Sequence, residues 1–129
     1  MIRIAILNKD RFYSKLLTSK LKNLYPGKIR RVTAFEYEDE IIDQLDKISK
    51  YDVVFIGDGI CSDLKKLVHV LRHTKCIANS KRNSRNQQMV DAGVKWIVPK
   101  SVIFDSYSLG PDDLEELRAP IDQWFLSRK

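Results

Sequence analysis

The side chains most able to do chemistry follow short apolar runs of the sequence. The clearest run, Val53 to Ile56, leads directly into Gly57 and Asp58. A carboxylate at this place is either a candidate phosphate acceptor or a turn residue that serves only the backbone between two glycines. Polar residues follow the other apolar runs as well, and the full candidate set is Asn8, Lys9, Asp10, Gly57, Asp58, Ser80 and Lys100.

A second reactive group is a pair of histidines four residues apart, His69 and His73, with Cys61 before them and Cys76 just beyond. Such spacing can hold zinc, but no fixed zinc motif is present, and we interpret the histidines as surface or boundary residues. The cysteines are expected to be reduced thiols. The sequence has no Gly-rich phosphate loop and no nucleophile paired with histidine at a strand end, so an enzyme is disfavoured.

The whole chain carries a formal net charge of +6, and basic residues cluster at Lys65–Lys66, Arg72–Lys75 and Lys81–Arg82 with Arg85. The run NSKRNSRNQQ, residues 79–88, contains Lys81, Arg82 and Arg85 and is expected to form a loop and the start of a helix, where anions are attracted. The charge permits an acidic partner, nucleic acid included. A nucleic-acid surface would need aromatic residues between these cations, and residues 81–88 contain none.

The elements that must position these residues alternate between two kinds. Short apolar segments predict strands at 2–7, 28–34, 53–56, 76–79 and 94–98. Helical spacing of apolar residues predicts helices at 11–25, 39–49, 63–73, 84–92 and 111–126. The first two helices are expected to face inward through Phe12, Leu16, Leu17, Leu21, Leu24, Ile41, Ile42, Leu45 and Ile48. Pro111 is expected in the first turn of the last helix, and Pro120 predicts a kink or a break there.

This alternation determines the expected fold. Strands that are apolar on both faces and separated by helices indicate a parallel sheet covered on both sides. Right-handed crossovers then give an α/β doubly wound, flavodoxin-like sandwich around a five-stranded sheet, with Arg30 and Arg31 marking an edge strand. The functional crevice of such a sheet lies at the carboxyl ends of its strands. The length of 129 residues suits a single domain, residues 1–129.

Three segments resemble the receiver domain of two-component response regulators. KYDVVFI, residues 50–56, is similar to the third strand of that family, and AGVKWIVPKS, residues 92–101, is similar to its fifth strand and places Lys100 on the family's lysine. PDDLEELRAPIDQWF resembles the last helix. The resemblance covers nearly the whole chain and implies the CheY-like fold.

The resemblance also implies a compact acidic site. In family receivers two carboxylates after the first strand hold Mg²⁺, and a third, after the third strand, ligates the metal and takes the phosphoryl group. A Ser or Thr after the fourth strand and the lysine after the fifth bind the phosphate. Magnesium requires hard oxygen ligands, and phosphoryl transfer requires its charge to be neutralised.

This sequence departs from that pattern at the positions that matter. The acidic pair falls on Asn8 and Lys9, and the acceptor position falls on Gly57, with Asp58 one place late. A slip of one residue reverses the side-chain direction in a strand, although a turn or bulge could restore it. Lys9 and Lys100 are candidates to pair with Asp10 or Asp58. We therefore expect a degenerate pocket without a cofactor, filled by a carboxylate–ammonium pair; Mg²⁺ is expected only if Asp58 is phosphorylated.

The function expected from these features is that of an atypical receiver-like signalling protein acting by protein–protein interaction. Its partner would be another signalling protein with an acidic surface, with a homodimer as a further option. The residues expected to bind it are Lys81, Arg82, Arg85, Trp96 and Tyr107. The alternatives are an active phospho-receiver using Asp58 with Asp10, a basic nucleic-acid-binding accessory protein, and a small flavodoxin-like enzyme or cofactor carrier.

The sequence also bears on location. No apolar run is long enough to span a membrane, and the N-terminus lacks a signal peptide, so we expect a cytoplasmic protein. The chain ends about where a receiver ends. Any output module is therefore expected on another polypeptide, unless this chain is part of a larger protein.

Overall fold

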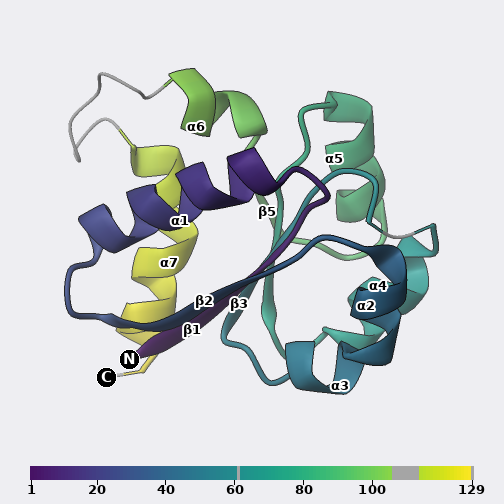
Figure 1. Cartoon of the computed structure of the whole chain (residues 1–129), viewed down its shortest axis with the longest axis horizontal. Coiled ribbons are helices and arrows are strands. Elements are labelled where there is room, and N and C mark those ends of the chain that lie inside the picture. The colour runs from purple at the N-terminus through teal and green to yellow at the C-terminus, as the bar shows by residue number, and fades with distance from the viewer. Residues whose placement is uncertain (61, 106–113, 129) are drawn as a thin grey trace.

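The computed structural model describes residues 1–60, 62–105 and 114–128. Within them, five parallel strands form one sheet in the order β2-β1-β3-β4-β5 (Figure 1). The strands are β1 Ile2–Leu7, β2 Ile29–Phe35, β3 Val53–Ile56, β4 Lys75–Ala78 and β5 Trp96–Ile97. This is the flavodoxin-like strand order, so the predicted doubly wound α/β fold is confirmed.

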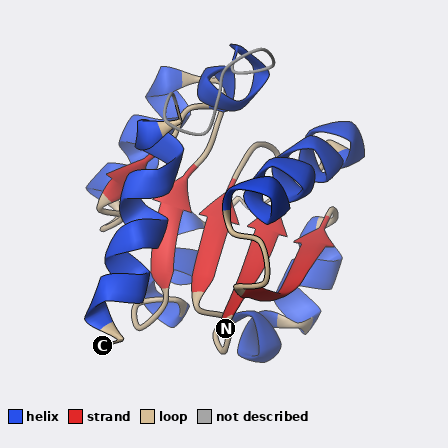
Figure 2. Ribbon diagram, turned by 90° about the vertical axis from the view of Figure 1, so that its left-hand side faces the viewer, coloured by secondary structure: helices blue, strands red, loops and turns tan. Residues whose placement is uncertain are grey.

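Helices cover both faces of the sheet (Figure 2). One layer consists of α1 Arg11–Leu24, α6 Lys100–Asp105 and α7 Glu115–Ser127, and the other of α2 Glu38–Asp43, α3 Leu45–Ile48, α4 Leu64–Val70 and α5 Asn83–Asp91. The strand alternation divides the core between them: Ile4 and Ile6 pack toward α1 and α7, whereas Ala5 and Leu7 pack toward the other layer. All four side chains are fully buried.

Two inward-facing predictions were wrong. Phe12 is 71% exposed, and Ile42 is 56% exposed. In α1 the buried residues are Tyr13, Ser14, Leu17 and Leu21; Tyr13, Leu17 and Leu21 are spaced by four residues and form one stripe along the helix. Tyr13 is amphipathic, and its hydroxyl finds a buried partner, so it takes the inward place that was expected for Phe12.

The C-terminal part differs most from expectation. No helix was predicted between residues 98 and 111, but Lys100–Asp105 form α6, and the fifth strand, predicted at 94–98, pairs only over Trp96–Ile97. Helix α7 runs from Glu115 to Ser127 through Pro120, so of the two outcomes predicted there, a kink or a break, the break is wrong. Proline there removes only the hydrogen bond from position 120 to the carbonyl of Glu116, and the ring itself is buried. The prediction for Pro111 lies outside the described residues.

The predicted edge strand is confirmed, and one helix start has a side-chain cap. β2 is an edge strand, and Arg30 and Arg31 on it are exposed. Asp63 caps α4 by accepting a hydrogen bond from the backbone N–H of Lys66 at 3.1 Å. None of the helices in the described ranges combines the length and the apolar composition that crossing a membrane requires.

Candidate functional site

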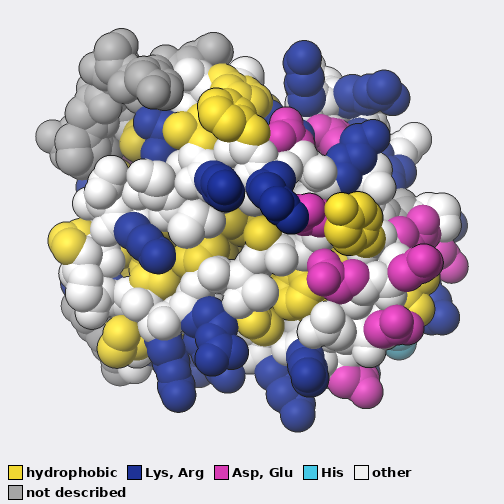
Figure 3. Space-filling view, in the orientation of Figure 1, with side chains coloured by type: hydrophobic (Ala, Val, Ile, Leu, Met, Phe, Trp, Pro, Cys, Tyr) yellow, Lys and Arg dark blue, Asp and Glu magenta, His cyan; other side chains and the backbone are white. Residues whose placement is uncertain are grey.

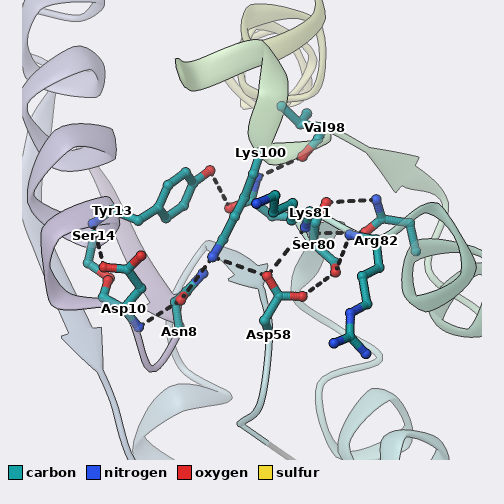
Figure 4. Close-up of polar contacts among 12 residues, drawn as sticks. Asn8, Asp10, Tyr13, Ser14, Asp58, Ser80, Lys81, Arg82, Val98 and Lys100 are labelled. Atoms are coloured by element: carbon teal, nitrogen blue, oxygen red, sulfur yellow. Dashed lines mark hydrogen bonds and ion pairs between the residues drawn. The ribbon is translucent and has the colours of Figure 1, made fainter. Parts of the chain in front are cut away.

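Four of the predicted site residues meet at the carboxyl end of the sheet (Figure 4). Asn8 follows β1, Asp58 follows β3 by two residues, Ser80 follows β4, and Lys100 begins α6. Asn8, Ser80 and Lys100 are buried, and Asp58 is partly buried. The topology therefore brings these four predicted residues together, although Asp58 reaches the others from a turn and not from the strand.

Lys100 is the centre of this cluster. Its Nζ lies 3.1 Å from Oδ2 of Asp58 and donates a longer hydrogen bond, at 3.4 Å, to Oδ1 of Asn8. It also lies 4.6 Å from the centre of the Tyr13 ring, where the negative face of the ring attracts a cation. A buried ammonium group needs such partners, because burial of an unpaired charge is costly. Lys100 and Asp58 thus form the predicted carboxylate–ammonium pair.

Asp58 has further partners. The hydroxyl of Ser80 donates to Oδ1 of Asp58, and the backbone N–H of Lys81 donates to Oδ2 at 3.3 Å. Burial raises the pKa of Asp58. The hydrogen bonds from Ser80, Lys100 and Lys81, together with the positive charge of Lys100, outweigh burial and hold the pKa below its ordinary value. Asp58 is therefore an ionised carboxylate at neutral pH, held by three donors.

Asn8 fills the space beside Gly57. Its Oδ1 accepts from the backbone N–H of Asp10 at 2.9 Å, and its Nδ2 is buried without a hydrogen-bond partner in the described part of the chain. A Cβ atom placed on Gly57 would lie 2.3 Å from that nitrogen. The position that the family resemblance assigns to the phosphate acceptor therefore has no side chain, and a neighbouring amide occupies the room for one.

Asp10 and Lys9 do not join the cluster. Asp10 is the N-cap of α1, where its Oδ1 accepts from the backbone N–H of Tyr13 at 3.1 Å. Lys9 is exposed, and its side chain lies against Gly59. Within the described residues Lys9 pairs with neither Asp10 nor Asp58, so of the two predicted cations only Lys100 makes the pair.

Sequence reasoning missed two residues of the site, Tyr13 and Asn79. The hydroxyl of Tyr13 donates to Oδ1 of Asn79 at 2.8 Å, and Nδ2 of Asn79 donates to the carbonyl of Val98 at 2.7 Å. Burial raises the pKa of Tyr13 far above its ordinary value. Asn79 directly follows β4, so its place at a strand end was a usable signal, whereas nothing in the sequence marked Tyr13 as a wall of the site.

The residues of this cluster do not fit a divalent cation. Mg²⁺ needs several oxygen ligands that are free to coordinate it. Here the oxygens of Asp58 accept from three donors, the oxygen of Asn8 accepts from Lys100, and Asp10 serves α1. Across the described residues, which include His69 and His73, no three His, Cys, Asp or Glu side chains lie together as a possible metal site.

The predicted partner-binding residues fall in different places. Lys81, Arg82 and Arg85 line one pocket at the start of α5, together with Lys9 and Asp58. Trp96 is half-buried at the start of β5, and the centre of its ring lies 5.0 Å from Nζ of Lys75. It lines a separate pocket that contains none of those three cations. Tyr107 lies outside the described residues. The structure therefore gathers the basic residues but does not place Trp96 among them.

Comparisons with known proteins identify the fold. No family model and no curated protein matches the sequence. Solved structures do match, among them a pilus assembly-related protein from Burkholderia pseudomallei, with a TM-score of 0.67 and 17% identity over 95% of this chain and 91% of that chain. The isolated receiver domain of RcsB from Salmonella enterica serovar Typhimurium matches with a TM-score of 0.68 and 15% identity, over 95% and 88% of the two chains.

A third similar structure is the receiver domain of a DNA-binding response regulator from Colwellia psychrerythraea, with a TM-score of 0.66 and 17% identity over 92% of this chain and 99% of that chain. Identities this low establish the fold and nothing finer. The chain thus has the CheY-like fold of response-regulator receiver domains, as its sequence segments predicted.

Proposed function

We propose that this protein is a receiver-fold signalling module that acts by binding another protein, and that Mg²⁺-dependent phosphorylation of an aspartate is not its switch. One observation carries the proposal: the ammonium group of Lys100 and the hydroxyl of Ser80 both bind the carboxylate of Asp58 at the carboxyl end of the sheet. This arrangement neutralises the only carboxylate of the cluster, and its neighbour Asn8 adds no charge.

The alternative within the same fold is an active phospho-receiver that uses Asp58. In its favour, Asp58 contacts Ser80 and Lys100, the two groups that the family resemblance assigns to phosphate binding. Against it, no second carboxylate reaches Asp58 in the described residues, because Asp10 caps α1 and the other position holds Asn8. Without a metal to neutralise the incoming group, the negative charges of carboxylate and phosphate repel each other.

The partner surface that we propose is the basic surface at the start of α5, formed by Lys81 and Arg82 before the helix and Arg85 in its first turn. Figure 3 shows Lys and Arg side chains gathered around the upper end of α5, whereas acidic side chains gather over α2. A positive patch accelerates and orients association with an acidic surface.

Because receivers typically signal inside the cell, we propose that the complex forms in the cytoplasm.

The experiment that tests the proposal is phosphorylation by a small acyl phosphate with Mg²⁺, followed by intact-protein mass spectrometry. We expect no increase in mass corresponding to a phosphoryl group in the wild type. A matched active receiver in the same reaction confirms the phosphodonor. A phosphoryl adduct that forms on the wild type, requires Mg²⁺ and is lost in Asp58→Asn would establish the active receiver and refute the proposal.

A further inference from the structure

A pocket of about 500 Å³ opens beside the Asp58 cluster, on the side away from Lys100. Three strand–helix connections form it, and its lining residues are Lys9, Asp58, Gly59, Lys81, Arg82, Ser84, Arg85 and Gln88. Its volume lies within the range of small-molecule sites. It also lies at the carboxyl end of the sheet, where doubly wound folds bind their ligands.

The lining of this pocket is strongly positive. Four cationic side chains face a single carboxylate, Asp58, and that carboxylate is already paired with Lys100. In the described part of the chain no carboxylate forms an ion pair with Lys9, Lys81 or Arg82. Cations held around one hollow repel each other, and a multiply charged anion between them would remove that repulsion.

The cations on one wall are held in place by the Asp58 cluster. The backbone N–H of Lys81 donates to Oδ2 of Asp58, and the backbone N–H of Arg82 donates to Oγ of Ser80 at 3.0 Å. Figure 4 shows Lys81 and Arg82 beside these two acceptors. The start of the basic loop is therefore anchored to buried residues.

The opposite wall depends on a glycine. The side chain of Lys9 lies so close over Gly59 that a Cβ atom there would come within 2.7 Å of its Cδ and 3.0 Å of its Nζ. Gly59 also has a φ of +66°, a conformation that side chains disfavour. In addition, the first turn of α5 contains no acidic residue, and its N-cap, Arg82, makes no side-chain cap. Gly59 therefore gives Lys9 the room to line the pocket, and the first turn of α5 adds no negative charge to it.

We propose that this pocket binds a small molecule carrying two or more linked phosphate groups. A single phosphate could not contact four cations spread around about 500 Å³, whereas a diphosphate spans more of them. Arginine binds phosphate oxygens through two parallel hydrogen bonds, and lysine adds a point charge. The inference goes beyond the proposed function and does not depend on it, since a ligand here can bind whether or not Asp58 is ever phosphorylated.

The test is isothermal titration calorimetry of the full chain with sodium pyrophosphate, at constant ionic strength. We expect saturable binding of one pyrophosphate per chain, at least about 10-fold tighter than inorganic phosphate. The double variant Lys81→Gln/Arg82→Gln should weaken binding by about 10-fold or more, because each side chain supplies a charge-assisted contact. The matched control is Arg30→Gln/Arg31→Gln on β2, which removes the same charge from exposed positions elsewhere and should bind as the wild type does.

Amide chemical shifts give a second measurement that does not depend on the variants. Pyrophosphate should shift the amides of residues 9, 58–59 and 81–88 in the wild type. The proposal is overturned by the absence of saturable binding, by equal weakening in both double variants, or by shifts confined to other regions. Competition with duplex DNA gives one further outcome. If DNA displaces pyrophosphate, and if both double variants bind DNA more weakly to the same extent, the proposal is overturned, because the surface is then an extended nucleic-acid face.

Discussion

Lys100 is a lysine in an unusual environment. Only 6% of its surface is exposed, yet its ammonium group has a carboxylate, an amide oxygen and an aromatic face within reach. Lysine seldom lies at such depth without a partner. The same side chain that the family resemblance assigns to phosphate binding is here bound to Asp58.

Substitution of this lysine tests the contact directly. We predict that Lys100→Met lowers the free energy of unfolding by about 1–3 kcal/mol, less than the loss for a fully buried pair, because the side chain of Asp58 is 24% exposed and water can partly solvate it. Urea denaturation measures the change. The double variant Lys100→Met/Asp58→Asn should lose less than the sum of the two single variants. Strict additivity would show that the two groups do not interact.

The pH dependence of stability follows from the same pair. The folded state holds the pKa of Asp58 below its ordinary value of 3.8, so the unfolded chain takes up a proton more readily. The stabilisation by Asp58 is therefore complete above about pH 4 and is lost as the pH falls through the lower, folded-state pKa. Unfolding measured from pH 2 to 7 should show wild type and Lys100→Met converging at the acidic end. A constant difference across that range would contradict the pairing.

Among the elements, the start of α1 shows how a residue that could ligate a metal is used for structure. Asp10 accepts from the backbone N–H of Tyr13 and thereby caps the helix whose next buried residue, Tyr13, forms a wall of the site. The sequence placed Asp10 beside the expected metal pocket. Only the backbone geometry of residues 10–13 shows that its carboxylate points to the helix.

We predict that Asp10→Ala lowers the free energy of unfolding by about 1 kcal/mol, the usual cost of a lost N-cap. Asp10→Ser should retain most of that stability, because serine caps helices nearly as well. Both effects should be the same with and without Mg²⁺ in thermal melts. If Mg²⁺ stabilises the wild type and Asp10→Ala or Asp10→Ser abolishes that effect, then Asp10 is a metal ligand and our interpretation is wrong.

Element patterns made most of the fold predictable. Fully apolar runs such as Val53–Ile56 and the alternation with helices were enough for the parallel sheet and its two helix layers. α6 was missed because KSVIFD lacks a cap signal and follows Pro99, which resembles a loop. The exposure of Phe12 was missed because the inward stripe of α1 starts one residue later. Such details depend on tertiary packing, which overrides local pattern.

At the scale of the whole molecule, the candidate site was predictable in its members but not in its contacts. Parallel strands bring their carboxyl ends together, so Asn8, Ser80 and Lys100 had to meet. The direction of Asp58 could not be deduced, because β3 ends at Ile56 and strand alternation no longer applies in the turn. The turn brings Asp58 back to Ser80 and Lys100, and leaves Gly57 beside Asn8.

The most direct test of the proposal that the Lys100–Asp58 pair excludes Mg²⁺ and phosphate is a crystal structure of the protein grown with Mg²⁺ and beryllofluoride, which imitates a phosphoryl group on aspartate. We predict that Nζ of Lys100 remains in contact with Asp58 and that neither ion lies between them. Electron density for both ions against the carboxylate of Asp58, with Lys100 turned to the fluorides, would contradict the account.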